Sequence, residues 1–390
     1  MVTSHLTAAA FLPGFAQHFS AAGWSVTIVC SPGEGLASLS ALNGVRVVTV
    51  RMHRDPAIFA DLIATVELAR ALRNLAPDLV LTATPKASLL GTVAARVTGV
   101  PLVVHLMWGL RSETLHGCRR AVVLALETVA TRFSHRVIAN SRSLGAELIR
   151  LRMLRPQDLT VLGAGSTGGV DLSRFTPPSV VPSPQLAALR AQLDELGSGP
   201  VIGFVGRITP DKGVGVLLEA TERLRSAGHS CRLMLIGAIE DLSLSNRIAD
   251  ARVRGLPVLL LDKADDTLPY FQAMDIHCLP TLREGFPNVC LEASACGVPT
   301  VTTDATGAVD SVKHEVTGLI VLKNDVKALA QALHTLLVDH GMRTRLGATA
   351  RQWVKREYDA ELVYGRQERY LRQLHLHHAR YRKWPSQFVD

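Results

Sequence analysis

Short runs of β-branched and other apolar residues alternate with helical stretches along almost the whole chain, and this alternation constrains the fold more than any other feature. A parallel strand that is buried on both faces reads as a nearly continuous apolar run, and each crossover to the next parallel strand needs a helix. The pattern therefore predicts the α/β class, with doubly wound parallel sheets that carry helices on both faces. The predicted strands are residues 25–30, 45–50, 79–84, 102–107, 136–140, 201–206, 232–237, 257–262, 276–280, 300–304 and 319–322.

A proline-rich segment divides these strands into two sets. Four prolines fall within Pro177–Pro184, a density that the interior of a strand or helix does not tolerate. At 390 residues the chain is also too long for one ordinary core. We therefore expect two Rossmann-like domains that face each other across a cleft. Their predicted bounds are 1–178 for the N-terminal domain, 179–198 for a linker that leads into the second domain, 199–355 for the C-terminal domain and 356–390 for a final segment.

The composition excludes several classes of protein. The chain is 47% hydrophobic and 19% charged, which is typical of a globular protein. The six cysteines form no C-x-x-C pair and have no histidine partner at zinc spacing, so we interpret them as reduced thiols of a cytosolic protein. No apolar run of about eighteen residues occurs, and the first residues lack the basic region of a signal peptide. The sequence therefore predicts neither a membrane span nor export.

Positive charge is concentrated in two regions. Residues 111–155 hold nine arginines against three glutamates, and residues 366–383 hold six basic residues against one acid. Such patches attract nucleic acid, anionic lipid or phosphorylated substrates, although solvated helix faces explain them equally well. Only 5% of the residues are aromatic, and no RNA-binding, zinc-finger or helix-turn-helix pattern is present. Nucleic acid is therefore the least favoured of the three partners.

One stretch, REGFPNVCLEASACGVPT, places two glutamates on either side of a predicted helix start. Asn288 is a favoured N-cap residue, so a short helix should begin near Val289 and end before the glycine that follows it. Glu284 then lies in the loop before the helix, and Glu292 lies one turn inside it. The free backbone N–H groups of the helix start lie between them and can bind an anion. The stretch thus offers two acceptors for hydroxyl groups and a cradle for a phosphate.

A second stretch, GRITPDKG, follows the strand predicted at 201–206 and leads into a helix. Its two cations, Arg207 and Lys212, stand beside backbone amides and can neutralise a diphosphate through charge-assisted hydrogen bonds. It is neither a P-loop nor a G-x-G-x-x-G turn. Ordinary strand-end charge is the alternative interpretation. Ligands of doubly wound sheets bind at the carboxyl ends of the strands. Because the glutamate-containing stretch also follows a strand, we favour the interpretation of GRITPDKG as part of a binding site.

These two stretches, with STGGVDLSRF before the prolines and HEVTGLIV near residue 320, resemble the retaining glycosyltransferases of the GT-B fold and the family-four type. The mark of that family is a pair of glutamates spaced as Glu284 and Glu292, and the likeness extends over almost the whole chain. ATPKASLLGTVAARVTGVP and GLRSETLHGCRR are similar to members that build bacterial capsule, O-antigen or lipid-linked oligosaccharides. The resemblance implies transfer of a hexose or N-acetylhexosamine from a UDP-sugar to a polyprenyl-diphosphate-linked saccharide, with no metal or other cofactor.

The resemblance also implies a role for each residue at the donor site. Glu284 would face the transferred sugar, and Glu292 would accept hydrogen bonds from the ribose. Arg207 and Lys212 would hold the diphosphate and stabilise it as it leaves. No D-x-D sequence occurs in the chain, which fits a family in which basic residues replace a divalent metal. The remaining donor contacts would come from Gly285, Phe286, Pro287, Asn288 and Val289.

In the predicted N-terminal domain the assignments are less specific. His105 falls where related enzymes often carry a histidine near the reacting sugar, which would make it a catalytic residue. A packed histidine at a strand end is an equally good interpretation. Lys86, Arg111 and Glu113 come just after predicted strands and are the candidates for binding the acceptor.

The final segment, from Arg356, has the composition of a helix, and by resemblance it returns to the N-terminal domain. The basic tail after it and the amphipathic stretch RRAVVLALETVATRF could rest on an anionic membrane surface. The apolar face of such a helix more often belongs to a core. We therefore expect a cytoplasmic protein, with a peripheral location on the inner face of the cell membrane as an open alternative.

Two other functions fit the same resemblance. A nucleotide-sugar epimerase of this fold cleaves its donor without an acceptor. An inactive GT-B subunit would instead dock an assembly complex through its basic face. The four retained donor-site residues, Glu284, Glu292, Arg207 and Lys212, argue against the inactive subunit.

Overall fold

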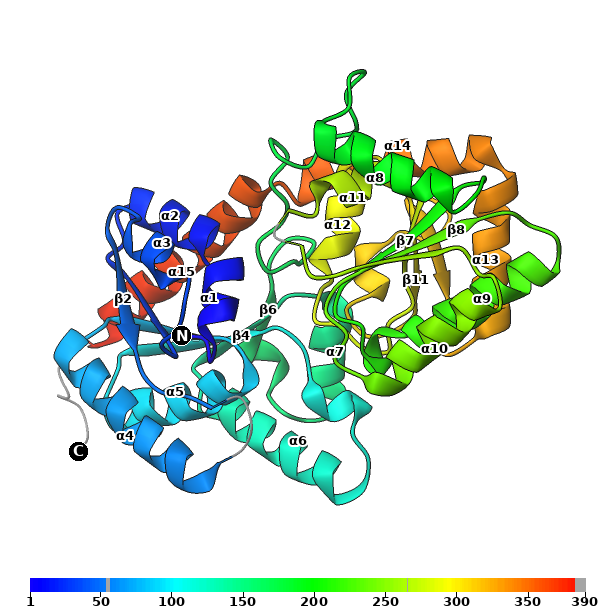
Figure 1. Ribbon diagram of the computed structural model, residues 1–390. Helices are drawn as coiled ribbons and strands as arrows, with labels where there is room; N and C mark the ends of the chain where they lie inside the picture. The colour runs from blue at the N-terminus through cyan, green and yellow to red at the C-terminus, as the bar shows by residue number, and fades with distance from the viewer. Residues whose placement is uncertain (54–56, 265, 383–390) are drawn as a thin grey trace, which may run out of the picture. The chain divides into compact units, whose positions relative to one another are not determined.

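The computed structural model describes residues 1–53, 57–264 and 266–382 (Figure 1). The chain divides into two compact units, which are unit 1 (Met1–Gly168 with the chain from Ala360 onward) and unit 2 (Gly169–Asp359). Of the predicted boundaries, the one after residue 178 lies ten residues beyond the first division, and the one after residue 355 lies four residues before the second. One reason is that the chain just before the prolines already contacts unit 2, where Gln272 Nε2 donates a hydrogen bond to the Thr176 carbonyl at 2.8 Å.

All the strand pairings between named strands are parallel, which confirms the predicted α/β class. Each predicted strand is present within a residue or two of its expected bounds. One further strand, Leu159–Val161, was missed, because three residues are too short for a recognisable apolar run. The basic tail beyond residue 382 lies outside the described residues.

The described residues of unit 1 contain six strands in two hydrogen-bonded groups, β1-β2 and β3-β4-β5-β6. Residues 1–3 join the groups, because the Val2 amide donates to the Val29 carbonyl and the Ala83 amide donates to the Met1 carbonyl. The strands of unit 1 are β1 (Val26–Cys30), β2 (Val45–Thr49), β3 (Leu79–Thr82), β4 (Leu102–Met107), β5 (Arg136–Ala139) and β6 (Leu159–Val161). Its helices are α1 (His5–Phe11), α2 (Pro13–Ala21), α3 (Leu36–Ser40), α4 (Ile58–Leu75), α5 (Pro85–Val97), α6 (Gly117–Arg132), α7 (Arg142–Arg150) and α15 (Ala360–Arg382), with 3-10 turns at Arg111–Thr114 and Pro156–Asp158.

Strand β4 shows why the apolar runs are continuous. Val103 packs in a core cluster with residues of α4 and α5, whereas Leu102 and Val104 pack in a second cluster with residues of α2 and α15. Successive side chains of a strand point to opposite faces, so a strand covered on both faces needs an apolar residue at every position. Helix α15 thus belongs to unit 1, and its Leu371 is buried in this second cluster.

Unit 2 is built on one sheet of six strands in the order β12-β11-β10-β7-β8-β9. The chain fills this sheet outward from β7, first on one side with β8 and β9 and then on the other with β10, β11 and β12. Its strands are β7 (Val201–Val205), β8 (Arg232–Ile236), β9 (Val258–Leu261), β10 (Ile276–Leu279), β11 (Thr300–Thr303) and β12 (Gly318–Val321). Its helices are α8 (Pro184–Glu195), α9 (Val214–Ser226), α10 (Leu242–Val253), α11 (Leu268–Ala273), α12 (Asn288–Ala295), α13 (Val326–Val338) and α14 (His340–Glu357), with 3-10 turns at Pro210–Lys212 and Val309–Ser311.

Two predictions from composition can be compared with the structure. All six cysteines are free thiols, as predicted, and Cys118 is the exposed one. In the described part of the chain, no helix has both the length and the low charge needed to pass through a bilayer.

Candidate functional site

The two stretches singled out in the predicted C-terminal domain meet at the carboxyl edge of the unit 2 sheet. Strands β7 and β10 are neighbours, and the chain continues to opposite sides of the sheet after them, so their loops flank a topological switch point. The loop after β10 lies against the loop after β7, because the Leu282 amide donates a hydrogen bond to the Asp211 carbonyl at 2.8 Å. The Thr281 hydroxyl donates to the same carbonyl at 3.1 Å.

At this contact, Lys212 and Glu284 form an ion pair. Lys212 Nζ lies 2.5 Å from Glu284 Oε1, and the side chains are only 18% and 12% exposed. Gly213 permits the close approach of the two loops, because a Cβ there would lie 1.9 Å from the Pro280 carbonyl oxygen, and its φ of 74° also favours glycine. The structure therefore brings together two of the four predicted charged residues, across 72 positions of sequence.

A second ion pair, which the sequence analysis missed, holds the same loops together. Arg283 donates to Asp211 Oδ2 at 3.0 Å, and Thr209 Oγ1 donates to Asp211 Oδ1 at 2.6 Å. Burial alone would raise the pKa of the Asp211 carboxyl, but the Thr209 hydrogen bond and the charge of Arg283 lower it below its ordinary value. Asp211 is therefore ionised at neutral pH. Arg283 and Asp211 adjoin Glu284 and Lys212 in the sequence, which is the signal that could have identified them.

A third loop supports Glu284 from its backbone. The Glu284 amide donates to the Thr306 carbonyl at 2.8 Å. Gly307, the next residue of this loop after β11, has a φ of 76°, and a Cβ there would lie 2.3 Å from the Gly285 carbonyl oxygen. Glycine is thus required where the two loops cross. No role was predicted for this loop from the sequence.

Helix α12 carries Glu292 one turn from its start, as predicted. Burial raises the pKa of the Glu292 carboxyl to about 7, and the positive charge of Arg174 offsets this effect only in part. Among the described residues, no side-chain hydrogen bond of Glu292 occurs. Arg174 is instead bonded to Asp266 at 2.8 Å. The buried Cys290 thiol lies close enough to feel the charges of Glu284, Lys212 and Glu292, so these groups share one region.

The other predicted donor-site residues lie between the two glutamates, with one correction. The predicted N-cap residue, Asn288, is already helical, and Pro287 occupies the N-cap position without a side-chain cap. Pro287 is extended, with φ of −81° and ψ of 102°, so the backbone turns into the helix one residue earlier than predicted. The Phe286 ring is buried and lies 5.3 Å from the Tyr358 ring, and Val289 packs against the core of unit 2. Gly285 lies in the loop that follows Glu284.

Arg207, the fourth predicted charged residue, is bonded elsewhere. Its guanidinium lies 2.7 Å from Glu240, and both side chains are substantially exposed, at 44% and 36%. Glu240 follows β8, so this ion pair also lies at the carboxyl edge of the sheet. The positive charge of Arg207 still contributes to the lowered pKa of Asp211. Arg207 is thus near the paired loops. Breaking its ion pair with Glu240 in order to bind a ligand costs little, because exposed ion pairs contribute roughly 0–1 kcal/mol to stability.

In unit 1, His105 lies within β4 and not after it. It is opposite Thr82 in β3 and Val137 in β5, and it is 4% exposed. Burial lowers the pKa of the imidazole to about 4, so it is neutral at physiological pH. Within the described residues its Nδ1 atom has no hydrogen-bond partner, so this buried polar atom is unsatisfied.

The predicted acceptor residues lie at the ends of unit 1 helices. Lys86 follows the first residue of α5, and its Nζ lies 2.7 Å from Asp61 Oδ1 on α4. Arg111 and Glu113 belong to one 3-10 turn, which is held by a residue that the sequence analysis missed. The buried Glu127 carboxylate on α6 accepts from the Arg111 amide and from the Ser112 hydroxyl, each at 2.7 Å.

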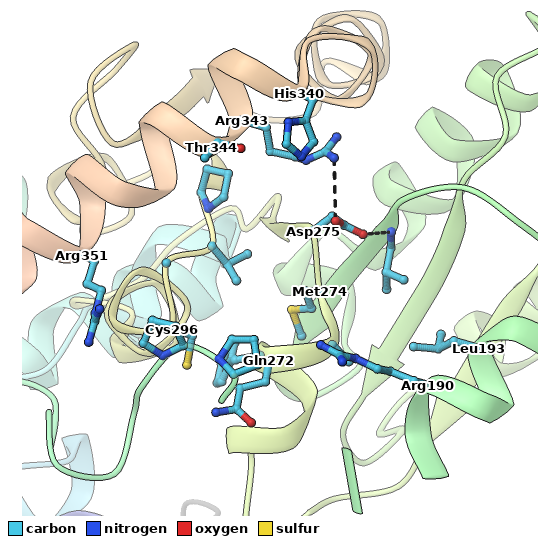
Figure 2. A pocket seen from close by; sticks show the side chains of 18 of the residues that line it. Arg190, Leu193, Gln272, Met274, Asp275, Cys296, His340, Arg343, Thr344 and Arg351 are labelled. Carbon is cyan, nitrogen blue, oxygen red and sulfur yellow. Dashed lines mark hydrogen bonds and ion pairs between the residues drawn. The ribbon is translucent and has the colours of Figure 1, made fainter. Parts of the chain in front are cut away.

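A cavity of about 640 Å³ in unit 2 lies at the opposite edge of the sheet. Its lining includes Val201, the first residue of β7, and Asp275 and Pro299, which precede β10 and β11. The Asp275 carboxylate accepts a hydrogen bond from the Val201 amide at 2.8 Å and lies 3.8 Å from the Arg343 guanidinium. Figure 2 shows the Arg343 and Asp275 side chains pointing toward one another. Ligands of doubly wound sheets bind at the other edge. None of the predicted site residues, all of which are described, lines this cavity.

Comparison with known proteins covers both units. The family described as "Glycosyl transferase 4-like domain" matches residues 8–165. The family described as "Glycosyl transferases group 1" matches residues 199–339. The second match spans the paired loops, the Thr306 loop and helix α12.

Individual relatives match over most of their length. The capsular polysaccharide biosynthesis glycosyltransferase CapM of Staphylococcus aureus is 33% identical over 343 residues, or 87% of each chain. An N,N'-diacetylbacillosaminyl-diphospho-undecaprenol alpha-1,3-N-acetylgalactosaminyltransferase of Campylobacter jejuni is 28% identical over 310 residues, or 78% of each chain. The structure of Anabaena HepE in complex with UDP-glucose matches with a TM-score of 0.76 at 21% identity, over 94% of this chain and 95% of that chain. At this identity the structural match shows the fold.

Proposed function

The chain belongs to the group 1 glycosyltransferases, which are GT-B hexosyltransferases, and from this premise we propose that it uses a UDP-sugar donor and a lipid-linked acceptor. It transfers a hexose or N-acetylhexosamine to a polyprenyl-diphosphate-linked saccharide, with retention at the anomeric carbon. The product serves bacterial surface polysaccharide assembly. The enzyme is cytoplasmic and peripheral on the inner face of the cell membrane.

The observation that carries this proposal is the ion pair between Lys212 and Glu284 at the switch point. It places a fixed cation and a carboxylate within 2.5 Å of one another, both largely shielded from water. A site for a nucleotide sugar needs a cation at the diphosphate and a hydrogen-bond acceptor at the hydroxyls of the sugar. The diphosphate and the sugar are adjacent in the donor. When the donor binds between Lys212 and Glu284, the lysine can therefore contact the diphosphate while the glutamate contacts the sugar hydroxyls.

In the reaction, the bond between the anomeric carbon and the diphosphate oxygen breaks, and a bond to an acceptor hydroxyl oxygen forms on the same face of the sugar. Lys212 and Arg207 stabilise the negative charge that develops on the leaving diphosphate, where preorganised cations are worth most. The departing phosphate takes the proton of the acceptor hydroxyl. Glu284 orients the sugar, Glu292 accepts from the ribose hydroxyls, and the backbone from Gly285 to Val289 completes the donor contacts. Neither a metal nor another cofactor has a role in these steps.

The choice of donor and acceptor is supported by what the relatives are named for. The HepE structure contains UDP-glucose, and the Campylobacter relative is named as acting on a diphospho-undecaprenol-linked sugar. In this chain, Lys86, Arg111 and Glu113 are assigned to the acceptor. His105 is assigned to the region of the reacting sugar, where a neutral imidazole with an unsatisfied nitrogen can exchange hydrogen bonds with a hydroxyl.

Incubation of the purified protein with labelled UDP-sugars and with polyprenyl-diphosphate-linked saccharides tests the proposal. We expect transfer of label to the lipid-linked product with at least one UDP-sugar, and release of UDP in step with it. Omitting the acceptor separates the rivals, because an epimerase converts or cleaves its donor without one. Absence of transfer and of donor turnover across a broad panel would contradict the proposal and favour the inactive docking subunit.

Replacing Arg207 by alanine is expected to lower kcat/KM for the donor by about tenfold or more, which corresponds to about 1.4 kcal/mol of transition-state stabilisation. Arg254 provides the matched control, because it is also an exposed arginine of unit 2 that is paired with a glutamate, Glu222. The Arg254→Ala variant should retain wild-type kinetics. Equal kinetics for Arg207→Ala and the wild type would remove Arg207 from the donor site.

Replacing Asp211 by asparagine removes the charge that holds Arg283 and joins the two loops. We expect kcat/KM to fall by about tenfold, because small displacements of Lys212 relative to the donor are costly for catalysis. Glu219→Gln is the control, since it removes one carboxylate from an exposed ion pair, with Arg247, on the same unit. If Glu219→Gln lowers the melting temperature and the activity as much as Asp211→Asn does, the loss of activity reflects lower stability and not a displacement of Lys212.

A further inference from the structure

The first two turns of α4 expose large apolar side chains to solvent. Ile58 is 84% exposed, Phe59 85%, Leu62 65%, Ile63 60% and Val66 44%. Because residues three and four positions apart are neighbours on a helix, these five side chains form one continuous stripe. Soluble monomers seldom leave a contiguous apolar patch of this size uncovered, so the stripe calls for a partner.

Helix α6 exposes a second apolar stripe. Val122 is 59% exposed, Leu126 43% and Val129 38%, and Phe133, just after the helix, is 49% exposed. These positions are again four, three and four residues apart, which places them on one side of the helix. From the sequence, the apolar side of this amphipathic stretch was expected to belong to a core more often than to a membrane. The structure leaves it in solvent.

The two stripes belong to one layer of unit 1. Helix α5 packs against both α4 and α6, and Figure 1 shows the three helices side by side. The charged side chains of α4 and α6 that are well exposed are all arginines, among them Arg70, Arg73 and Arg119. Of the acids of these two helices, Glu127 is buried, Asp61 is partly buried and paired with Lys86, and Glu67 is partly buried. We call the exposed side chains of α4 and α6 the apolar-basic face.

We propose that the apolar-basic face docks unit 1 on an anionic lipid bilayer, with the apolar stripes in the headgroup and acyl boundary and the arginines among the lipid phosphates. An interfacial helix buries its apolar side to this depth, and each nearby basic residue adds attraction to anionic lipid. A second copy of the chain fits the face poorly. A two-fold contact would set arginines against arginines, with no exposed acid on these helices to compensate.

The face also adjoins a residue assigned to the acceptor. Asp61, on α4 between Phe59 and Leu62, holds the Lys86 ammonium at 2.7 Å. Docking through the first turns of α4 would therefore place Lys86 close to the level of the lipid phosphates, where the diphosphate of a polyprenyl-linked saccharide also lies. This last step rests on the proposed function, whereas the docking surface itself rests on the exposure and charge of the helices.

Vesicle sedimentation tests the docking surface. The wild-type chain should bind vesicles that contain phosphatidylglycerol and should bind phosphatidylcholine vesicles much less. The double variant Ile58→Ser/Phe59→Ser should bind the anionic vesicles about tenfold or more weakly, because two apolar side chains no longer enter the lipid. The charge reversal Arg70→Glu/Arg73→Glu should weaken binding to a similar degree, and its loss should depend on salt.

Two exposed apolar residues of α10 provide the matched control. Leu242 is 85% exposed and Val253 87%, so Leu242→Ser/Val253→Ser removes two similarly exposed apolar side chains from unit 2 and should leave vesicle binding unchanged. A cooperative thermal unfolding transition near the wild-type melting temperature serves as the folding control for every variant. Vesicle binding requires no turnover, so the docking surface and the proposed reaction succeed or fail separately.

Three outcomes would overturn the proposal. The first is wild-type vesicle binding by the folded Ile58→Ser/Phe59→Ser variant. The second is an equal loss of binding by the α10 control. The third is a wild-type dimer in sedimentation velocity that the α4 variant dissociates, since this result would assign the face to a second copy of the chain.

Discussion

The Lys212→Ala variant is expected to lose about 10²–10³-fold in kcat/KM for the donor, which is the usual cost of removing one preorganised group from a developing negative charge. Lys212 is only 18% exposed, so water substitutes poorly for the missing ammonium. The loss should appear mainly in kcat, because the charge on the leaving diphosphate is greater in the transition state than in the bound donor.

The control for this variant is Lys327→Ala, which removes an exposed lysine near the start of α13 in the same unit. It should retain wild-type kinetics. Lys212→Ala also leaves the shielded Glu284 carboxylate without its ion-pair partner, so the melting temperature should fall and assays belong well below it. A variant that is folded, binds UDP and turns over at the wild-type rate would remove Lys212 from the mechanism.

The Glu292→Gln variant should be more stable than the wild type above pH 7. In the native chain burial raises the pKa of this carboxyl from 4.5 to about 7, whereas the unfolded chain loses the proton near 4.5. Between these values the native state binds more protons than the unfolded state, so the stability of the wild type falls as pH rises. The full cost, roughly 3 kcal/mol, is present above pH 7. Glutamine does not titrate, so the Glu292→Gln variant does not carry this cost in stability.

Denaturant unfolding at pH 5 and pH 8 measures this difference. The gap between Glu292→Gln and the wild type should be largest at pH 8 and should shrink towards the lower pH. Glu195→Gln, which changes an exposed residue at the end of α8 in the same unit, serves as control and should show no such trend. If the gap is equal at both pH values, the proton on Glu292 does not govern stability.

The same substitution should weaken donor binding. Ribose hydroxyls donate to a carboxylate more strongly than to an amide oxygen, because charge-assisted hydrogen bonds are the stronger ones. For the wild type, donor affinity should therefore rise with pH through about 7, as the carboxyl loses its proton. The variant should show a weaker affinity without this rise. An unchanged pH profile would contradict the assignment of Glu292 to the ribose.

The two predictions together describe a carboxylate that costs stability and contributes to binding. Glu292 has no hydrogen-bonded partner for its side chain in the described part of the chain, so in the free protein nothing nearby repays its burial in full. The ribose of the proposed donor would supply those hydrogen bonds. Polar groups kept at the expense of stability are typical of functional sites.

Much of the fold was predictable from the sequence because the signals are local. A run such as that of β7 carries no polar side chain, and only a strand covered on both faces needs this. The short helix α12 was predicted from its proline, asparagine and following glycine, with an error of one residue at its start. Strand β6 was missed, since its three residues carry too little periodicity and are held by pairing with β5.

The candidate site was predictable only in part. Glu284, Glu292, Arg207 and Lys212 were identified by residue type and by resemblance, because their spacing is recorded in the chain itself. The residues that hold them in place were not identified from the sequence. The bond from Arg283 to Asp211 and the support of Glu284 by the Thr306 carbonyl depend on which strands are neighbours, and no local pattern specifies that.

The sequence by itself determined the class of fold, the division into two parts and the residues that carry charge to the strand ends, because apolar periodicity and turn residues act over a few positions. Only the tertiary structure decided that β7 and β10 lie side by side, that Lys212 meets Glu284, and that burial raises the pKa of Glu292. It also decided that the apolar sides of α4 and α6 remain in solvent. The physical reason is that contact and burial are properties of the packed chain, in which residues far apart in sequence share one dielectric environment.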